Sequence, residues 1–217
     1  MLQNNNRVVI SFNFAYMSKK NWIYIGFFTA LVITFYFVLT ALVPEFGKRI
    51  PPISYVRPFA FTNQEGKRFT EKDVAGKVFV AEYFFTTCKS ICPIMNNNMR
   101  KVYEEFKNEK DFLILSHSST PEIDSVPVLK RYADSMGVSA SNWVFLTGSK
   151  DSLYNMARVS YVIDDPNNHV ANSEDDFIHT QFWALVDKNG DVRKIYDGLK
   201  GSEVNTLIED IKKLLRK

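Results

Sequence analysis

The longest hydrophobic stretch of the chain runs from Trp22 to Val43 and contains no charged residue. An α-helix of that length can cross the roughly 30 Å hydrocarbon core of a membrane. No face of the stretch is polar, which disfavours a helix packed into the core of a domain. We therefore predict a transmembrane anchor over residues 22–43, preceded by a tail of residues 1–21 that holds no motif.

A cleaved signal peptide is the alternative interpretation of this stretch. A signal peptide has an apolar core of about 7–15 residues, followed by a cleavage site of small residues. The stretch here is longer, ends in TALVPEF and is not followed by a cysteine for lipoprotein processing, so we prefer the anchor. Lys19 and Lys20 flank it on one side and Lys48, Arg49 and Arg57 on the other, so charge does not set its orientation.

After a proline-containing linker at residues 44–57, short apolar runs alternate with segments of helical periodicity. The predicted strands are two short ones around the Gln-Glu-Gly turn of FAFTNQEGKRFT, then Val78–Phe85, Phe112–Ser116 and Trp143–Leu146, and a hairpin of Phe182–Asp187 and Val192–Tyr196. The predicted helices are MNNNMRKVYEEFKNE, Val126–Met136 ending at Gly137, Ser149–Val159 capped by Ser149, and about Ser202–Leu215. Residues 164–176 are polar and indicate an inserted loop or hairpin.

The order of these elements predicts the fold. Strands and helices alternate as in parallel βαβ units, and a β-hairpin and a final helix follow. This order is typical of a thioredoxin-like α/β fold, in which helices flank a central mixed sheet. We expect one such domain over residues 58–217, preceded by the transmembrane helix.

The placement of charge disfavours one class of partner. The chain has 27 basic residues, of which three precede residue 44, so 24 remain to balance the 24 acidic residues of the rest of the chain. A neutral domain lacks the basic surface that nucleic-acid binding requires. We therefore expect no nucleic-acid partner.

The two cysteines, Cys88 and Cys92, lie in TTCKSICP, between a predicted buried strand and a predicted helix. A helix N-terminus stabilises thiolates and lowers their pKa, and Pro93 is tolerated in the first turn. Residues i and i+4 of one helical turn share a face, so both sulfurs can point at one ion. Soft thiolates favour Cu(I), zinc or iron–sulfur centres. The pair is therefore a candidate metal site or redox-active disulfide, with buried core cysteines as the remaining interpretation.

Three histidines, His117, His169 and His179, are candidates for a third ligand. His179 ranks first, because it precedes the strand Phe182–Asp187 at the edge that faces the cysteine loop in a thioredoxin-like layout. Thioredoxin-like oxidoreductases have a cis-proline at about that point, whereas this chain has DFIHTQFW. His169, in a polar loop, ranks second. His117 ranks third, since we expect it just past a strand end on the same rim.

From about residue 55 to residue 215 the sequence resembles the SCO/SenC family of membrane-tethered copper-binding proteins, which take part in cytochrome c oxidase assembly. The resemblance rests on YFFTTCKSICP as the family's C-x-x-x-C-P loop and on DFIHTQFWALVDKNGDVRKIYDG as its histidine strand and hairpin. TPEIDSVPVLKRYA and WVFLTG are similar to two further family segments. Thr120 stands where the family usually has an Asp, Asp124 matches the second Asp of that segment, and Lys89 replaces a common Pro.

The resemblance implies a copper ion that is bound by Cys88, Cys92 and His179 and delivered to the copper-containing subunit of cytochrome c oxidase. It also implies that the domain lies on the extracytoplasmic side of the membrane, and it allows a thiol-reducing role toward the cysteines of the oxidase centre. Lys89 adds positive charge beside the thiolates, which we expect to lower their pKa further.

Three other functions stay open. A membrane-anchored thiol–disulfide oxidoreductase is the main alternative, although the C-x-x-C motif and the proline before the hairpin strand are absent. A peroxiredoxin-type peroxidase would have Thr three residues before its reactive cysteine, where this chain has Phe85. A structural zinc site would need a fourth protein ligand beyond Cys88, Cys92 and His179.

Overall fold

The computed structural model describes residues 18–42, 51–139, 141–164 and 180–216. The chain divides into two units, Met1–Ile50 and Pro51–Lys217. Each unit is considered by itself.

In the first unit, helix α1 (Lys19–Leu42) is long and apolar enough to cross a membrane. It starts three residues before the predicted span, and Val43 lies outside the described residues. The hydroxyl of Thr29 donates to the carbonyl of Ile25 at 2.8 Å, and that of Thr40 to the carbonyl of Phe37 at 3.0 Å. These bonds satisfy the two threonine hydroxyls within the helix itself, as a hydrocarbon environment requires.

The second unit is built on one mixed sheet with the strand order β1-β8-β7-β4-β5-β6-β2-β3. The central strands β4, β5 and β6 are parallel, whereas β7 pairs antiparallel with β4 and β2 pairs antiparallel with β6. The strands are β1 Ser54–Tyr55, β2 Ala60–Asn63, β3 Arg68–Thr70, β4 Val78–Phe84, β5 Phe112–Ser118, β6 Trp143–Thr147, β7 Phe182–Val186 and β8 Asp191–Asp197. The predicted α/β fold with a central mixed sheet is confirmed.

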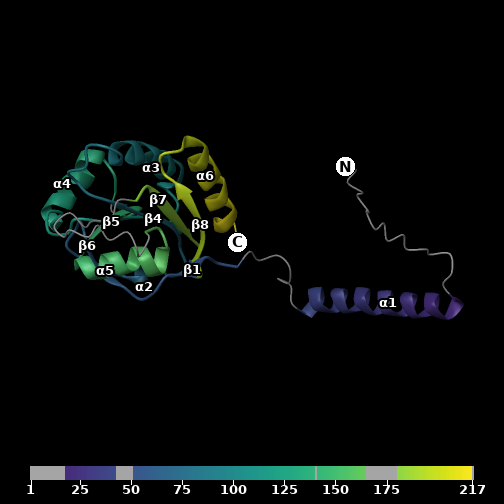
Figure 1. Ribbon diagram of the computed structural model, residues 1–217. Coiled ribbons are helices and arrows are strands. Elements are labelled where there is room, and N and C mark those ends of the chain that lie inside the picture. The colour runs from purple at the N-terminus through teal and green to yellow at the C-terminus, as the bar shows by residue number, and fades with distance from the viewer. Residues whose placement is uncertain (1–17, 43–50, 140, 165–179, 217) are drawn as a thin grey trace, which may run out of the picture. The chain divides into compact units, whose positions relative to one another are not determined.

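Helices cover both faces of this sheet. The helical elements are α2 Glu71–Val74, α3 Cys92–Phe106, α4 Val126–Met136, α5 Lys150–Asn155, the π-helix η2 Met156–Tyr161 and α6 Gly201–Leu215. Figure 1 shows α3 and α6 together on one face and α5 on the opposite face. Each face has its own apolar core: one is formed with α3, α4 and α6, and the other with α2, α5 and η2.

Alternation along the buried strands explains how one sheet serves two cores. In β4, Val78 and Val80 contribute to the core under α3 and α6, while Phe79 and Ala81 contribute to the core under α5. Every residue of β4 and of β5 is buried. Strands buried on both faces have few polar positions, which is why most of each strand is an apolar run in the sequence.

Helix α2 was not predicted, α3 begins at Cys92 rather than Met95, and β5 extends to Ser118 rather than Ser116. Two further differences concern β1 and α5. Residues 54 and 55, expected to be linker, form β1, because Ser54 and Tyr55 pair with the edge strand β8. The helix predicted at Ser149–Val159 is a short α-helix that continues as a π-helix to Tyr161. The Ser149 side chain caps it, as predicted. Val162 ends it in the left-handed conformation, with φ of 55°.

Candidate functional site

The two cysteines lie in the loop between β4 and α3. This loop leaves the sheet at the carboxyl end of β4, the edge at which the parallel strands β5 and β6 also end. Functional side chains of α/β folds gather at this edge. The backbone N–H of Cys88 donates to the carbonyl of Phe85 at 3.2 Å, which closes a turn at the start of the loop.

Cys92 is the first residue of α3, and Pro93 occupies the first turn as predicted. Cys88 lies before the helix, so the two sulfurs do not share a helical face and that part of the prediction is wrong. The thiols are nevertheless close enough for each to shift the pKa of the other. Both cysteines are free thiols in this structure.

The two thiols differ in exposure and in pKa. Cys92 is 4% exposed, and burial together with its hydrogen bond to Cys88 raises its pKa to about 12. Cys88 is half-buried. Its burial favours a higher pKa, but hydrogen bonds with Cys92 and Ser90 outweigh that effect and lower the pKa of Cys88. The prediction of two acidic thiols is therefore correct for Cys88 and wrong for Cys92.

Glu82 is a buried carboxyl group on the cysteine side of the sheet that the sequence analysis missed. It is 1% exposed; its Oε1 accepts a hydrogen bond from the Ser116 hydroxyl at 2.6 Å, and its Oε2 has no partner among the residues that the structure describes. Burial raises the pKa of Glu82 to about 7 despite the bond from Ser116. Its charge also contributes to the raised pKa of Cys92. The signal for it was an acid inside the apolar run VFVAEYFF.

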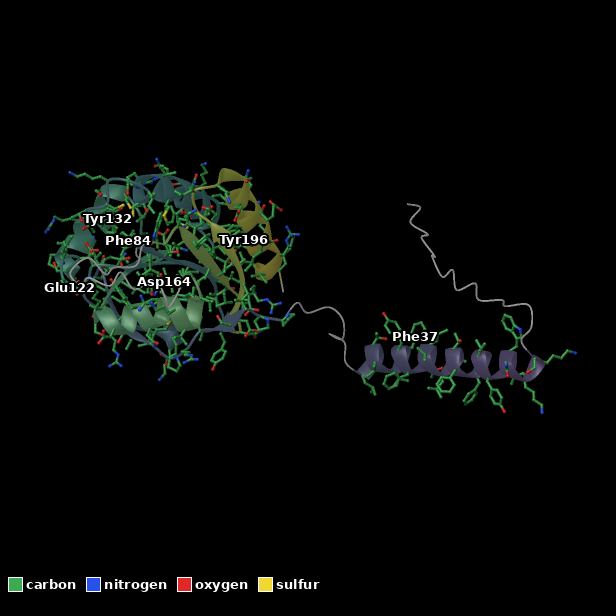
Figure 2. All side chains as sticks on the ribbon, viewed as in Figure 1. Phe37, Phe84, Glu122, Tyr132, Asp164 and Tyr196 are labelled. Atoms are coloured by element: carbon green, nitrogen blue, oxygen red, sulfur yellow. The ribbon has the colours of Figure 1, made fainter. Side chains whose placement is uncertain are left out.

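Tyr132 of α4 closes the same side of the site. Figure 2 shows it beside Phe84 at the end of β4, and their ring centroids are 5.3 Å apart. Burial and the charges of Glu82, Cys92 and Cys88 raise the pKa of Tyr132 above its usual range. The hydroxyl therefore stays protonated, and it accepts a hydrogen bond from the side-chain amide of Asn96 on α3.

The start of the cysteine loop is held by Asp124, which lies in the turn after β5 and is fully buried. Its Oδ1 accepts hydrogen bonds from the backbone N–H of Thr86 at 3.3 Å and from the Thr86 hydroxyl at 2.5 Å. Its Oδ2 accepts from the hydroxyls of Ser118, at 2.6 Å, and Thr120, at 3.2 Å. Thr120, which stands where the family usually has an Asp, therefore serves as a donor to Asp124.

His117 does not lie on the rim of the site, so its placement there is wrong. Strand β5 extends through Ser118, and His117 points to the opposite face of the sheet from Cys92. It is fully buried against Tyr83, whose ring is stacked at 5.1 Å, and against Phe61 and Tyr161. Burial lowers the pKa of His117 to about 4, so its imidazole is neutral.

His179 and His169 lie outside the described residues. The strand that follows His179 is placed: β7 runs antiparallel to β4, with Ala184 opposite Ala81. Since β4 ends where the cysteine loop begins, β7 starts at that same edge of the sheet. Within the described ranges no three His, Cys, Asp or Glu side chains are grouped closely enough to hold a metal ion. The two thiols are therefore an incomplete ligand set by themselves.

Sequence comparison extends this description. The family model described as SCO1/SenC matches residues 48–216. A relative from Bacillus subtilis (strain 168), described as a SCO1 protein homolog, is 35% identical over 166 residues, which are 74% of this chain and 83% of the relative.

Two solved structures have the same fold. BsSco, a member of the Sco family of cytochrome c oxidase assembly proteins in which a disulfide switch was identified, has a TM-score of 0.62 and 34% identity over 75% of this chain and 95% of its own. The crystal structure of Arabidopsis thaliana ScoI with copper bound has a TM-score of 0.59 and 25% identity over 75% of this chain and 99% of its own. With the family model covering residues 48–216, these similarities show that the chain belongs to the SCO1/SenC family.

Proposed function

We propose that this protein binds a copper ion through Cys88, Cys92 and His179 and delivers it to the copper centre of cytochrome c oxidase. The observation that carries the proposal is the pair of free thiols, close enough to shift each other's pKa, at the sheet edge where β7 also begins. Copper is bound in the structure of the Arabidopsis relative, and BsSco belongs to a family of oxidase assembly proteins.

The chemistry of the donor set fits copper as cargo. Two thiolates and an imidazole are soft or intermediate ligands, which suit Cu(I) and leave room for transfer to another site. Cys92 is protonated at neutral pH, because its pKa is about 12, so binding of the ion must displace that proton. Binding should therefore weaken in acid, where protons compete for both sulfurs and for His179.

A thiol–disulfide oxidoreductase is the second candidate, and one observation favours it. Cys88 is half-buried with a lowered pKa, whereas Cys92 is buried with a raised pKa. An accessible, acidic thiol beside a buried one is the arrangement of a nucleophile and its resolving partner. In the relative BsSco a disulfide switch was identified. A Cys88–Cys92 disulfide would remove both sulfur ligands at once and make copper binding depend on redox state.

We place the domain on the extracytoplasmic side of a membrane, anchored by residues 22–43. Helix α1 supports a single anchor by its length and composition. The redox chemistry of the cysteine pair supports the side, since disulfides persist outside the reducing cytoplasm.

The copper site is tested on the full-length, reduced protein in detergent by competition for Cu(I) with a chelator of known affinity. We expect Cys88→Ser and Cys92→Ser to abolish retention of Cu(I), because each removes a thiolate. His179→Ala should weaken binding by at least about 100-fold, since loss of a mere supporting contact to a ligand already costs 10- to 100-fold. His169→Ala is the matched control and should bind as wild type.

Three outcomes would contradict the proposal. Wild-type affinity in His179→Ala with loss in His169→Ala would show that the third ligand is wrong. Retention of Cu(I) by both cysteine variants would remove the copper site from this loop. Reduction of an oxidase-fragment disulfide by metal-free protein that retains no Cu(I) would establish the oxidoreductase instead.

A further inference from the structure

Both oxygens of Asp124 accept hydrogen bonds, whereas one oxygen of Glu82, the other buried carboxyl group of the site, has no partner in the described part of the chain. The side chain of Asp124 accepts four hydrogen bonds, from Thr86, Ser118 and Thr120. The described part of the chain contains no ion pair to it, so this buried carboxylate is balanced by neutral donors alone. A buried carboxylate is stable only when hydrogen-bond donors satisfy its oxygens. The folded state therefore favours positions in which these donors stay within hydrogen-bonding distance of Asp124.

The two oxygens of Asp124 connect two different parts of the site. Oδ2 is bonded to Ser118, the last residue of β5, and to Thr120, which follows it. Oδ1 is bonded twice to Thr86, two residues before Cys88. The carboxylate therefore joins the end of β5 to the first turn of the cysteine loop, which the β-sheet pairing does not reach, since β4 ends at Phe84.

Local geometry fixes Asp124 itself. Its backbone N–H donates to the carbonyl of Thr120 at 2.9 Å, and the N–H of Thr120 donates to the Ser118 hydroxyl at 3.1 Å. This turn brings the side chain back over the end of β5, and α4 begins two residues later at Val126. The position of Asp124 is thus fixed by the turn between β5 and α4. By contrast, the loop from Cys88 to Ser90 has half-buried and exposed side chains and no regular structure.

We propose that Asp124 is the positioning residue of the cysteine loop, and that its carboxylate, through Thr86, holds Cys88 where the ion is bound. The expected effect on copper affinity rests on the proposed function, whereas the expected effect on amide hydrogen exchange in the loop does not. Groups that orient ligands without touching the metal typically control affinity by about 10- to 100-fold.

The test uses four variants of the full-length protein in detergent. Asp124→Asn keeps the shape but removes the charge, and Thr86→Val removes one hydroxyl donor with little change of volume. Thr86→Ser restores the hydroxyl. Asp73→Asn is the matched control, because Asp73 also accepts bonds from a threonine, Thr70, at the helix cap of α2.

Two quantities are measured: amide hydrogen exchange in residues 86–91 of the reduced, metal-free protein, and the Cu(I) dissociation constant. In Asp124→Asn and Thr86→Val we expect faster exchange in this loop with unchanged exchange in β4 and β5, and a dissociation constant raised about 10- to 100-fold. Thr86→Ser should match wild type in both. Asp73→Asn should exchange faster only around α2 and bind copper normally.

If Thr86→Val has wild-type loop exchange and wild-type copper affinity, Asp124 does not position the loop. If Asp124→Asn fails to fold, the result for Thr86→Val alone tests whether Asp124 positions the loop. If wild-type protein binds no Cu(I), the proposed function fails, yet the exchange measurement still shows whether Asp124 holds the loop.

Discussion

At the scale of single residues, burial favours the neutral form of two titratable groups that lie on opposite faces of the sheet, Glu82 and His117. On the cysteine side, burial raises the pKa of Glu82 from 4.5 to about 7. On the other side, burial lowers the pKa of His117 from 6.5 to about 4. Both groups are uncharged over much of the range between pH 4 and pH 7, because burial disfavours the charged form of each.

These shifts predict opposite dependences of stability on pH. The stability associated with Glu82 is lost as pH rises from 4.5 to 7, because the folded state keeps a proton that the unfolded state releases. The stability associated with His117 is lost as pH falls from 6.5 to 4, because only the unfolded state gains the proton. Each shift corresponds to on the order of 3 kcal/mol.

We therefore expect Glu82→Gln to gain stability relative to wild type as pH rises from 4.5 to 7, and His117→Phe to gain stability relative to wild type as pH falls from 6.5 to 4. Denaturant unfolding of the full-length protein in detergent, repeated across this pH range, measures both differences. A difference from wild type that stays constant with pH would show that the substituted group does not have the shifted pKa.

At the scale of elements, the start of β7 packs closely against the turn that follows β8. Gly198 follows β8, and its N–H donates to the carbonyl of Gln181 at 2.8 Å, while its carbonyl accepts from the Asn98 side chain at 2.8 Å. A Cβ added at Gly198 would lie 2.4 Å from the ring of Trp183, which is fully buried. Any larger residue here must displace either the ring or the backbone.

Gly198→Ala should therefore destabilise the domain by about 1–3 kcal/mol, the usual cost of overpacking a core. Gly201→Ala is its control: nothing lies within 4 Å of a Cβ there, and alanine is the better helix former in α6 by up to about 1 kcal/mol. Denaturant unfolding compares the two. Equal stability of Gly198→Ala and wild type would mean that the Trp183 ring is free to move.

At the scale of the whole molecule, the proposed function requires the anchor to lie in the membrane and the domain to lie outside the cytoplasm. If residues 22–43 span the membrane and the domain is exported, a phosphatase reporter that needs disulfides should be active when fused after Lys217. A reporter that folds only in the reducing cytoplasm should be inactive at the same position. The opposite pattern of activity would place the domain inside and contradict the proposed topology.

Local signals in the sequence were sufficient for most elements and for the cysteine pair. Helix α4 has the predicted bounds, since Gly137 ends it with a left-handed φ of 64°. The hairpin of β7 and β8 follows from its Asn-Gly turn and its apolar runs, and α1 follows from its uncharged length. These features depend on residues close together in the chain, whose preferences the rest of the fold does not override.

The tertiary structure alone decided how the site residues behave. The two thiols differ in pKa because Cys92 is buried at the start of α3 while Cys88 remains in the loop. His117 points away from the site because β5 extends two residues further than the predicted strand Phe112–Ser116, and alternation then directs its side chain to the other face. The link from Asp124 to Thr86 joins residues 38 positions apart. Burial and such contacts arise between distant segments, so no local pattern in the sequence reports them.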